Sequence, residues 1–94
     1  MFVITLRLAD RSRAPQFMDA HNAWIRRGLD DGVFLLVGTL QPNAGGVILA
    51  HGASAGEIGT RVEADPFVAE GIVSAEILAV TPGRTDERLA FMAA

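Results

Sequence analysis

One long segment with helical periodicity, residues 14–30, constrains the fold of this chain more than any other feature. Pro15 suits the first turn of a helix because its φ angle is fixed, and Gly28 or Gly32 can end the helix. At about 100° per residue, the large apolar side chains fall within one stripe and the charged ones gather on the opposite side. The segment therefore predicts an amphipathic helix that packs against a sheet.

Four apolar segments with the character of strands accompany this helix. Residues 2–8 and 72–80 alternate between more and less apolar positions, whereas 33–37 and 47–50 are short continuous apolar runs. The turn formers of residues 41–46 join the second and third segments as a hairpin. These patterns predict four strands in a single sheet.

A second helix is predicted from residue 54 to about residue 64. Ser54 and Glu57 have the spacing of a capping box, and Pro66 disfavours helical geometry in the residue before it. The order is then strand, helix, two strands, helix, strand. It predicts an α+β, ferredoxin-like βαββαβ domain with a four-stranded antiparallel sheet and both helices on one face. We expect one domain over residues 1–94, with a core to about residue 82 and a tail over residues 83–94.

Composition favours association of this domain with itself. Half of the residues are hydrophobic and the mean hydropathy is positive, which is more apolar surface than one small domain usually buries. Two copies packed through the uncovered sheet face would bury it and leave a cavity where polar side chains interrupt it. We therefore expect a homodimer or larger oligomer with the architecture of a dimeric α+β barrel.

The chain has no Cys, Lys or Tyr, which excludes several classes of chemistry. Thiolate nucleophiles, thiolate metal sites, Schiff-base lysines and tyrosyl acids are all impossible. The net charge of −3 and the scattered arginines argue against nucleic-acid binding. We expect a cytoplasmic protein without cofactor, metal or membrane partner, because neither a signal peptide nor a membrane-spanning run is recognisable.

A histidine interrupts the apolar stripe of the first helix. With Phe17 as zero, His21 lies at about 40°, where an aliphatic residue is expected. A buried imidazole needs an acceptor for its N–H, either a backbone carbonyl in a structural role or a carboxylate that prepares the ring for proton transfer. Asp65 is the candidate carboxylate, although an aspartate directly before Pro66 is also an ideal helix cap. One oxygen of Asp65 could cap while the other faces His21.

Several motifs together resemble the YciI (YCII-related) family. They are His21-Asn22-Ala23-Trp24-Ile25, a glycine turn into a strand that ends at Gly38, the helix at Ser54-Ala55-Gly56-Glu57, and the corner Asp65-Pro66-Phe67 before Gly71. The resemblance extends to about Pro82. It implies the fold of dimeric α+β barrels such as muconolactone isomerase-like and small monooxygenase-like proteins, with His21 and Asp65 as an active-site pair. Most members have no established substrate, and one branch resembles a dehydrochlorinase of a chlorinated hydroxyhydroquinone.

Five further side chains have both a structural and a functional interpretation. Trp24 and Phe67 belong in the core, where either could also wall a ligand pocket. Arg7 and Glu76 could pair across neighbouring strands, or could hold an anionic or phenolic ligand on the open sheet face. His51 fits a solvated turn, because two histidines without a motif spacing are weak support for a metal site.

These features predict a small enzyme that uses His21 as general base and Asp65 to orient it. The expected reaction is proton transfer, elimination or isomerisation on a small aromatic or lactone-like molecule. Covalent hydrolysis is poorly supported, because each serine has a loop, cap or strand role. The alternative is a non-catalytic ligand-binding or assembly module in which the same residues are structural.

Overall fold

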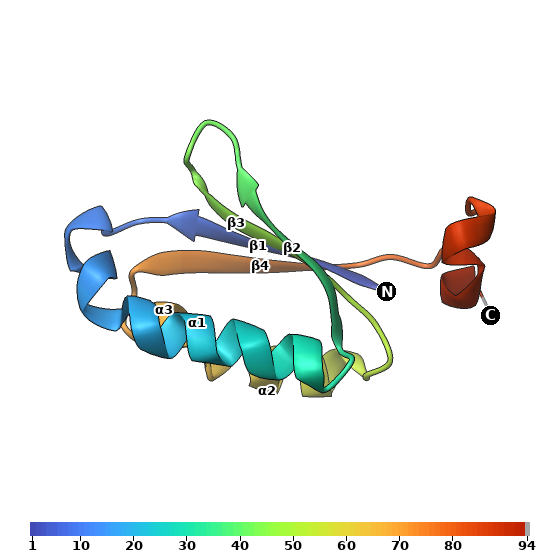
Figure 1. The fold of residues 1–94 in the computed structure, drawn as a ribbon, viewed down its shortest axis with the longest axis horizontal. Helices are drawn as coiled ribbons and strands as arrows, with labels where there is room; N and C mark the ends of the chain where they lie inside the picture. The colour runs from blue at the N-terminus through green and yellow to red at the C-terminus, as the bar shows by residue number, and fades with distance from the viewer. Residues whose placement is uncertain (94) are drawn as a thin grey trace.

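A computed structural model describes residues 1–93 as two layers, a sheet and the helices that cover one of its faces (Figure 1). The strand order is β2-β3-β1-β4, and every neighbouring pair is antiparallel. This is the ferredoxin-like α+β arrangement that the sequence predicts. In chain order the elements are β1 (Phe2–Leu8), η1 (Arg11–Arg13), α1 (Ala14–Asp30), β2 (Phe34–Leu40), β3 (Gly45–Ala50), α2 (Ala55–Glu63), α3 (Pro66–Ala69), β4 (Val73–Ala79) and η2 (Glu87–Ala93).

The two strands of the β2–β3 hairpin are longer than the sequence predicts. β2 continues to Leu40, beyond the expected end at Val37 or Gly38, and β3 begins at Gly45. The extra pairs include Leu40 opposite Gly45. Gly45 has a φ of 131°, and a Cβ there would collide with the backbone carbonyl of Leu6 in β1. The sequence indicates that Gly45 is part of a turn. In the structure its missing side chain allows β3 to approach β1 closely.

The core lies between the sheet and the helices. Alternate strand residues such as Ile4, Leu6 and Ile48 point to the covered face and are buried, together with Trp24 of α1 and Phe34 of β2. Figure 1 shows α1 and α2 on this same face of the sheet. The two-residue period of the strands thus decides which side chains form the core.

The other face of the sheet is uncovered. By the strand register, Val3, Thr5 and Arg7 of β1 share this face with Leu78 and Glu76 of β4. Leu78 is 46% exposed. The open, largely apolar face that the sequence predicts is therefore present in the single chain.

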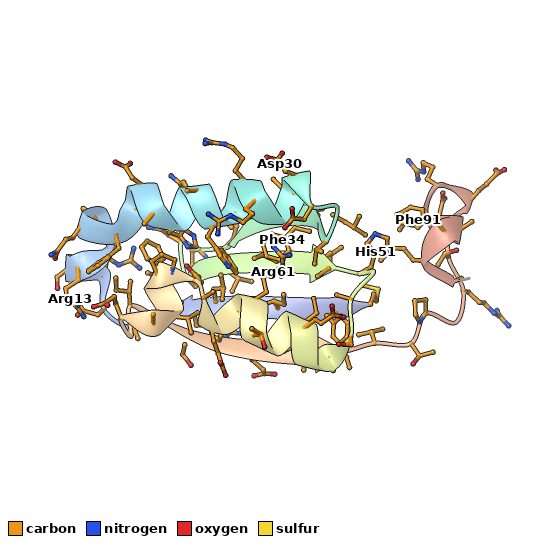
Figure 2. The ribbon with its side chains drawn as sticks, turned by 90° about the horizontal axis from the view of Figure 1, so that it is seen from below. Arg13, Asp30, Phe34, His51, Arg61 and Phe91 are labelled. Carbon is orange, nitrogen blue, oxygen red and sulfur yellow. The ribbon has the colours of Figure 1, made fainter. Side chains whose placement is uncertain are left out.

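The tail beyond β4 lies apart from the two layers. An extended segment leads to η2, which is separated from the sheet in both views (Figure 1, Figure 2). Its contact with the domain includes Phe91, whose ring meets the edge of His51 with centroids 5.5 Å apart. His51 is partly buried, whereas the sequence favours a solvated turn. Within residues 1–93, no helix combines the length and apolar composition needed to cross a bilayer.

Candidate functional site

His21 of α1 and Asp65 at the start of α3 are in direct contact. Nδ1 of His21 lies 2.8 Å from Oδ1 of Asp65. The imidazole side chain is 12% exposed and the carboxylate is fully buried. The inward histidine and its carboxylate partner, both expected from the sequence, are thus placed together by the packing of α1 against α3.

Asp65 holds this position because it also caps α3. Its Oδ1 accepts a hydrogen bond from the backbone N–H of Phe67 at 3.0 Å. The expectation that one oxygen caps while the other faces His21 is wrong, because Oδ1 makes both contacts. Oδ2 is buried and has no hydrogen-bond partner among residues 1–93. The physical reason is that one carboxylate oxygen has two lone pairs, so Oδ1 can accept from the N–H of Phe67 and contact Nδ1 of His21 at the same time.

Aromatic neighbours fix the plane of the His21 ring. Phe67 stacks on it with ring centroids 4.0 Å apart and planes 5° from parallel. The ring of Trp24 is also stacked near His21, with ring centroids 5.8 Å apart and planes 27° from parallel. An ionised carboxylate only accepts hydrogen bonds, so opposite an ionised Asp65 the donor is Nδ1 of His21, and a neutral ring then has its lone pair on Nε2. The stack and the carboxylate together leave Nε2 as the nitrogen available to a ligand.

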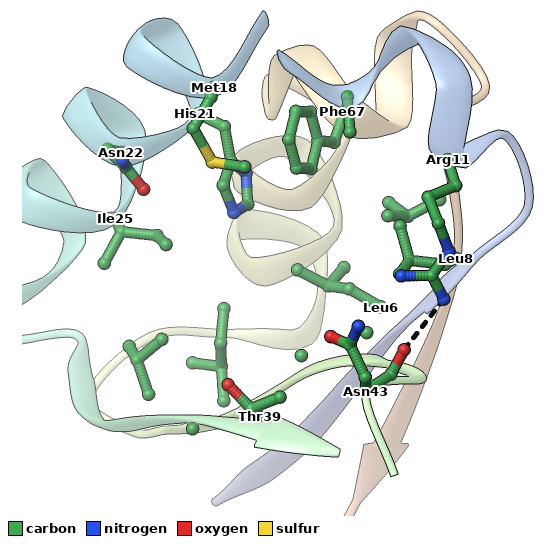
Figure 3. Close-up of a pocket in the computed structure, with 17 residues that line it drawn as sticks. Leu6, Leu8, Arg11, Met18, His21, Asn22, Ile25, Thr39, Asn43 and Phe67 are labelled. Carbon is green, nitrogen blue, oxygen red and sulfur yellow. Dashed lines mark hydrogen bonds between the residues drawn. The ribbon is translucent and has the colours of Figure 1, made fainter. Parts of the chain in front are cut away.

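A cavity of about 380 Å³ lies beside this ring, on the covered side of the sheet between α1 and the β2–β3 hairpin (Figure 3). Its size is at the lower end of small-molecule pockets, which measure roughly 300–1,000 Å³. The walls are mainly apolar, with Leu6, Ile25 and Ile48 among them. The polar groups that line it are His21, Arg11, Asn22, Thr39 and Asn43.

The other predicted contact residues divide between the two faces of the sheet. Phe67 lines the cavity beside His21, as the sequence suggests. Trp24 does not line it. Its indole N–H donates to the carbonyl of Arg61 at 2.9 Å, and its ring packs edge-on against Phe34 at 5.0 Å. Trp24 therefore belongs to the core, where it supports the histidine ring.

By the strand register, Arg7 and Glu76 are on the open face, and neither lines this cavity. Both are exposed. Within residues 1–93 they form no ion pair with each other, so the predicted cross-strand pair is absent. Arg7 lies opposite Ser74 and Glu76 opposite Thr5, so the two charges are offset by two positions. In the single chain, neither contacts the site that contains His21.

The sequence interpretation missed the polar residues on the far wall of the cavity. Thr39 is in β2, beyond the point where the strand was expected to end, and Arg11 and Asn43 lie in segments interpreted as connections. A signal was available for Thr39, because a strand extended to Leu40 turns residue 39 toward the helices. For Arg11 no local pattern indicates which way the side chain points.

No group of three or more potential metal-binding His, Asp or Glu side chains occurs within residues 1–93. The two histidines have separate environments, because His21 contacts Asp65 and His51 contacts Phe91. The described part of the chain therefore offers no metal site that joins them.

Comparison with known proteins gives a family and a fold. A model of the YCII-related domain matches residues 1–82, and no curated protein shows significant similarity. One similar solved structure is 5-chloro-2-hydroxyhydroquinone dehydrochlorinase (TftG) from Burkholderia phenoliruptrix AC1100, in complex with 2,5-dihydroxybenzoquinone. The two chains are 18% identical with a TM-score of 0.65, over 88% of this chain and 96% of that one, which indicates a shared fold. Because the family model spans the whole two-layer core, the chain belongs to the YCII-related domain family.

Proposed function

We propose that this protein is an enzyme that moves a proton on a small molecule bound in the cavity beside His21. The observation that carries the proposal is the 2.8 Å contact between Nδ1 of His21 and buried Asp65, with the other edge of the ring at a ligand-sized cavity. This contact holds the tautomer in which Nε2 is a base. A base that is already oriented needs no reorganisation when substrate binds.

In the proposed step, a C–H or O–H of the ligand gives its proton to Nε2 of His21. The ring becomes an imidazolium beside the Asp65 carboxylate, which stabilises the new charge. The electron pair left on the ligand either expels a leaving group, giving elimination, or accepts the proton back at another atom, giving isomerisation. TftG is a dehydrochlorinase, and loss of HCl is a reaction of the elimination type, which supports this class.

The ligand complex of TftG provides a first probe, 2,5-dihydroxybenzoquinone. Trp24 is the only tryptophan and lies 5.8 Å from His21, so its fluorescence should report binding. We expect the probe to bind to the wild type and the affinity to fall in His21→Gln. His51→Gln is the matched control, because His51 is outside the cavity.

Proton transfer is tested separately by exchange. In D₂O, the wild type should accelerate loss of the NMR signal from an acidic C–H of the probe or of related hydroxyquinones, and His21→Gln should not. If His21→Gln only lowers the melting temperature and leaves binding and exchange unchanged, the catalytic proposal is wrong. Binding without exchange in the wild type would favour the ligand-binding module.

We also propose that two copies pack through the open sheet face. Large apolar side chains remain exposed there, with Leu36 50% and Leu78 46% exposed. Burial of such a patch contributes roughly 25 cal/mol per Å² of apolar surface. Sedimentation velocity should show a dimer that Leu36→Glu dissociates. Leu29→Glu, at an exposed position of α1, is the control that should leave the dimer intact.

A further inference from the structure

The cavity contains one cation that the proposed proton transfer does not use. Arg11, in η1 directly after β1, lines the cavity and lies across it from α1 (Figure 3). Its Nη2 donates to the backbone carbonyl of Asn43 at 2.9 Å. Among residues 1–93, no carboxylate forms an ion pair with Arg11. Most donors of this guanidinium therefore remain available to a ligand.

Arg13, two residues later in the same turn, is in a different situation. Its Nη2 lies 3.0 Å from Oε1 of Glu70, and its Nη1 lies 4.0 Å from Oδ2 of Asp10. It also donates to the carbonyl of Glu70 at 2.9 Å. The turn thus pairs Arg13 with carboxylates and leaves Arg11, which lines the cavity from an exposed position, without a counter-ion among residues 1–93.

The charge of the cavity lining follows from these positions. Arg11 and His21 are the ionisable side chains that line it, and no carboxylate does so. Asp65 lies behind the His21 ring and contributes its negative charge at that end only. The electrostatic potential of the cavity is therefore positive at the end near η1. An anion is bound less favourably at the end beside His21 than at the end near η1. Between the two ends the walls are apolar.

We propose that Arg11 binds an anionic oxygen of the ligand, so that the site selects small organic monoanions with an apolar body. The guanidinium presents a planar fork of donors, which matches a carboxylate and also accepts a single phenolate oxygen. The acidic C–H or O–H of the ligand then faces Nε2 of His21. This inference rests on the proposed function only in its use of the same cavity.

Three related probes test the selection, with binding followed by NMR shifts of backbone amides and of arginine Nε–Hε groups. Benzoate offers a carboxylate, 4-nitrophenolate a phenolate oxygen, and benzamide a neutral group of the same shape as benzoate. Because a charge-assisted hydrogen bond is about twice as strong as a neutral one, we expect at least one anion to bind about tenfold more tightly than benzamide. The largest shifts should include Arg11 and Thr39.

Variants assign this preference to Arg11. Arg11→Gln should abolish it, and Arg11→Lys should keep part of it because the charge remains while the fork is lost. Arg26→Gln removes the same charge from an exposed position of α1 outside the cavity. Because solvent and salt screen a charge that far from the ligand, this control should change anion affinity by less than about twofold.

The outcomes separate this inference from the proposed function. If Arg11→Gln retains the anion preference, or if neither anion binds better than benzamide to the wild type, the proposal that Arg11 binds an anionic oxygen is wrong. The proposed proton transfer is then still judged by the result with His21→Gln. If His21→Gln leaves proton exchange unchanged while Arg11→Gln abolishes anion preference, the cavity is an anion site without the proposed chemistry. If only one of the two anions binds more tightly than benzamide, that anion identifies the oxygen that Arg11 binds as a carboxylate or a phenolate oxygen.

Discussion

Two helix N-caps in this chain use the same local interaction, a side-chain oxygen that accepts from a backbone N–H, but they lie in different environments. At the start of α2, Ser54 Oγ accepts from the N–H of Glu57 at 3.2 Å, and Glu57 Oε1 accepts from the N–H of Ser54 at 2.9 Å. At the start of α3, Asp65 Oδ1 accepts from the N–H of Phe67 and also contacts His21. The first cap is exposed and its contacts are local, whereas the second is buried and reaches another helix.

The difference shows when a cap becomes part of a site. A carboxylate oxygen can accept more than one hydrogen bond, so a cap that is buried against another element can orient a side chain there. Ser54 has no such neighbour within the described residues and serves its own helix. Asp65 has one because α1 crosses α3 at His21. The comparison therefore predicts that the two caps differ in both stability and function.

The largest effect is expected at the buried cap. Asp65→Ala leaves the N–H of Phe67 and Nδ1–H of His21 without their acceptor, so the free energy of unfolding should fall by about 3 kcal/mol. Proton exchange should fall by at least about 100-fold, because the orienter of the base is lost. Asp65→Asn keeps an oxygen in place and should lose less stability. Chemical unfolding and NMR exchange measure both. A variant as stable as Asp86→Ala, in the exposed tail, would contradict the role of Asp65.

A smaller effect is expected at the exposed cap. Ser54→Ala removes the acceptor for one N–H of α2 and should cost about 1 kcal/mol of unfolding free energy. Ligand binding and proton exchange should stay at wild-type levels, because Ser54 does not line the cavity. Loss of exchange in this variant, measured below its melting temperature, would mean that the two caps do not differ in the way proposed.

The exposed cap should also depend on pH. Hydrogen bonds from the backbone and side chain of Ser54 lower the pKa of Glu57 from its ordinary value. A carboxyl whose pKa is lowered by folding stabilises the protein above its unfolded pKa, and this stability is lost as the pH falls through the lowered value. The difference in melting temperature between wild type and Glu57→Gln should therefore narrow in acid. A difference that stays constant from neutral to acidic pH would contradict this cause.

The smallest effect is expected for charges that serve neither cap. Arg7→Gln and Glu76→Gln lie on the open face and are exposed in the single chain, so each should change the free energy of unfolding by less than about 0.5 kcal/mol when combined with the dissociating Leu36→Glu substitution. Benzoate affinity should remain unchanged, because neither residue lines the cavity. A loss of more than about 1 kcal/mol in the dissociated chain would contradict this expectation, whereas the same loss in the dimer would indicate that these charges become buried between the two copies.

Local patterns were sufficient for most of the fold. The helix over residues 14–30, the capping box at Ser54 and the corner at Asp65 all occur as predicted. Each depends on interactions within a few residues, which sequence patterns record directly. The hairpin is the exception. Its strands extend to Leu40 and from Gly45 because pairing between them, and not local preference, determines where they end.

The candidate site divides in the same way. From the sequence alone, His21 faces inward, because helical periodicity places it in the apolar stripe, and Asp65 is a cap, because it precedes Pro66. Only the tertiary structure shows that a single oxygen serves both contacts and that Arg11 turns toward the cavity while Arg13 is paired with Glu70. The physical reason is range: periodicity and capping act within a turn or two of the chain. The contact of His21 with Asp65 joins residues 44 positions apart, which only packing can bring together.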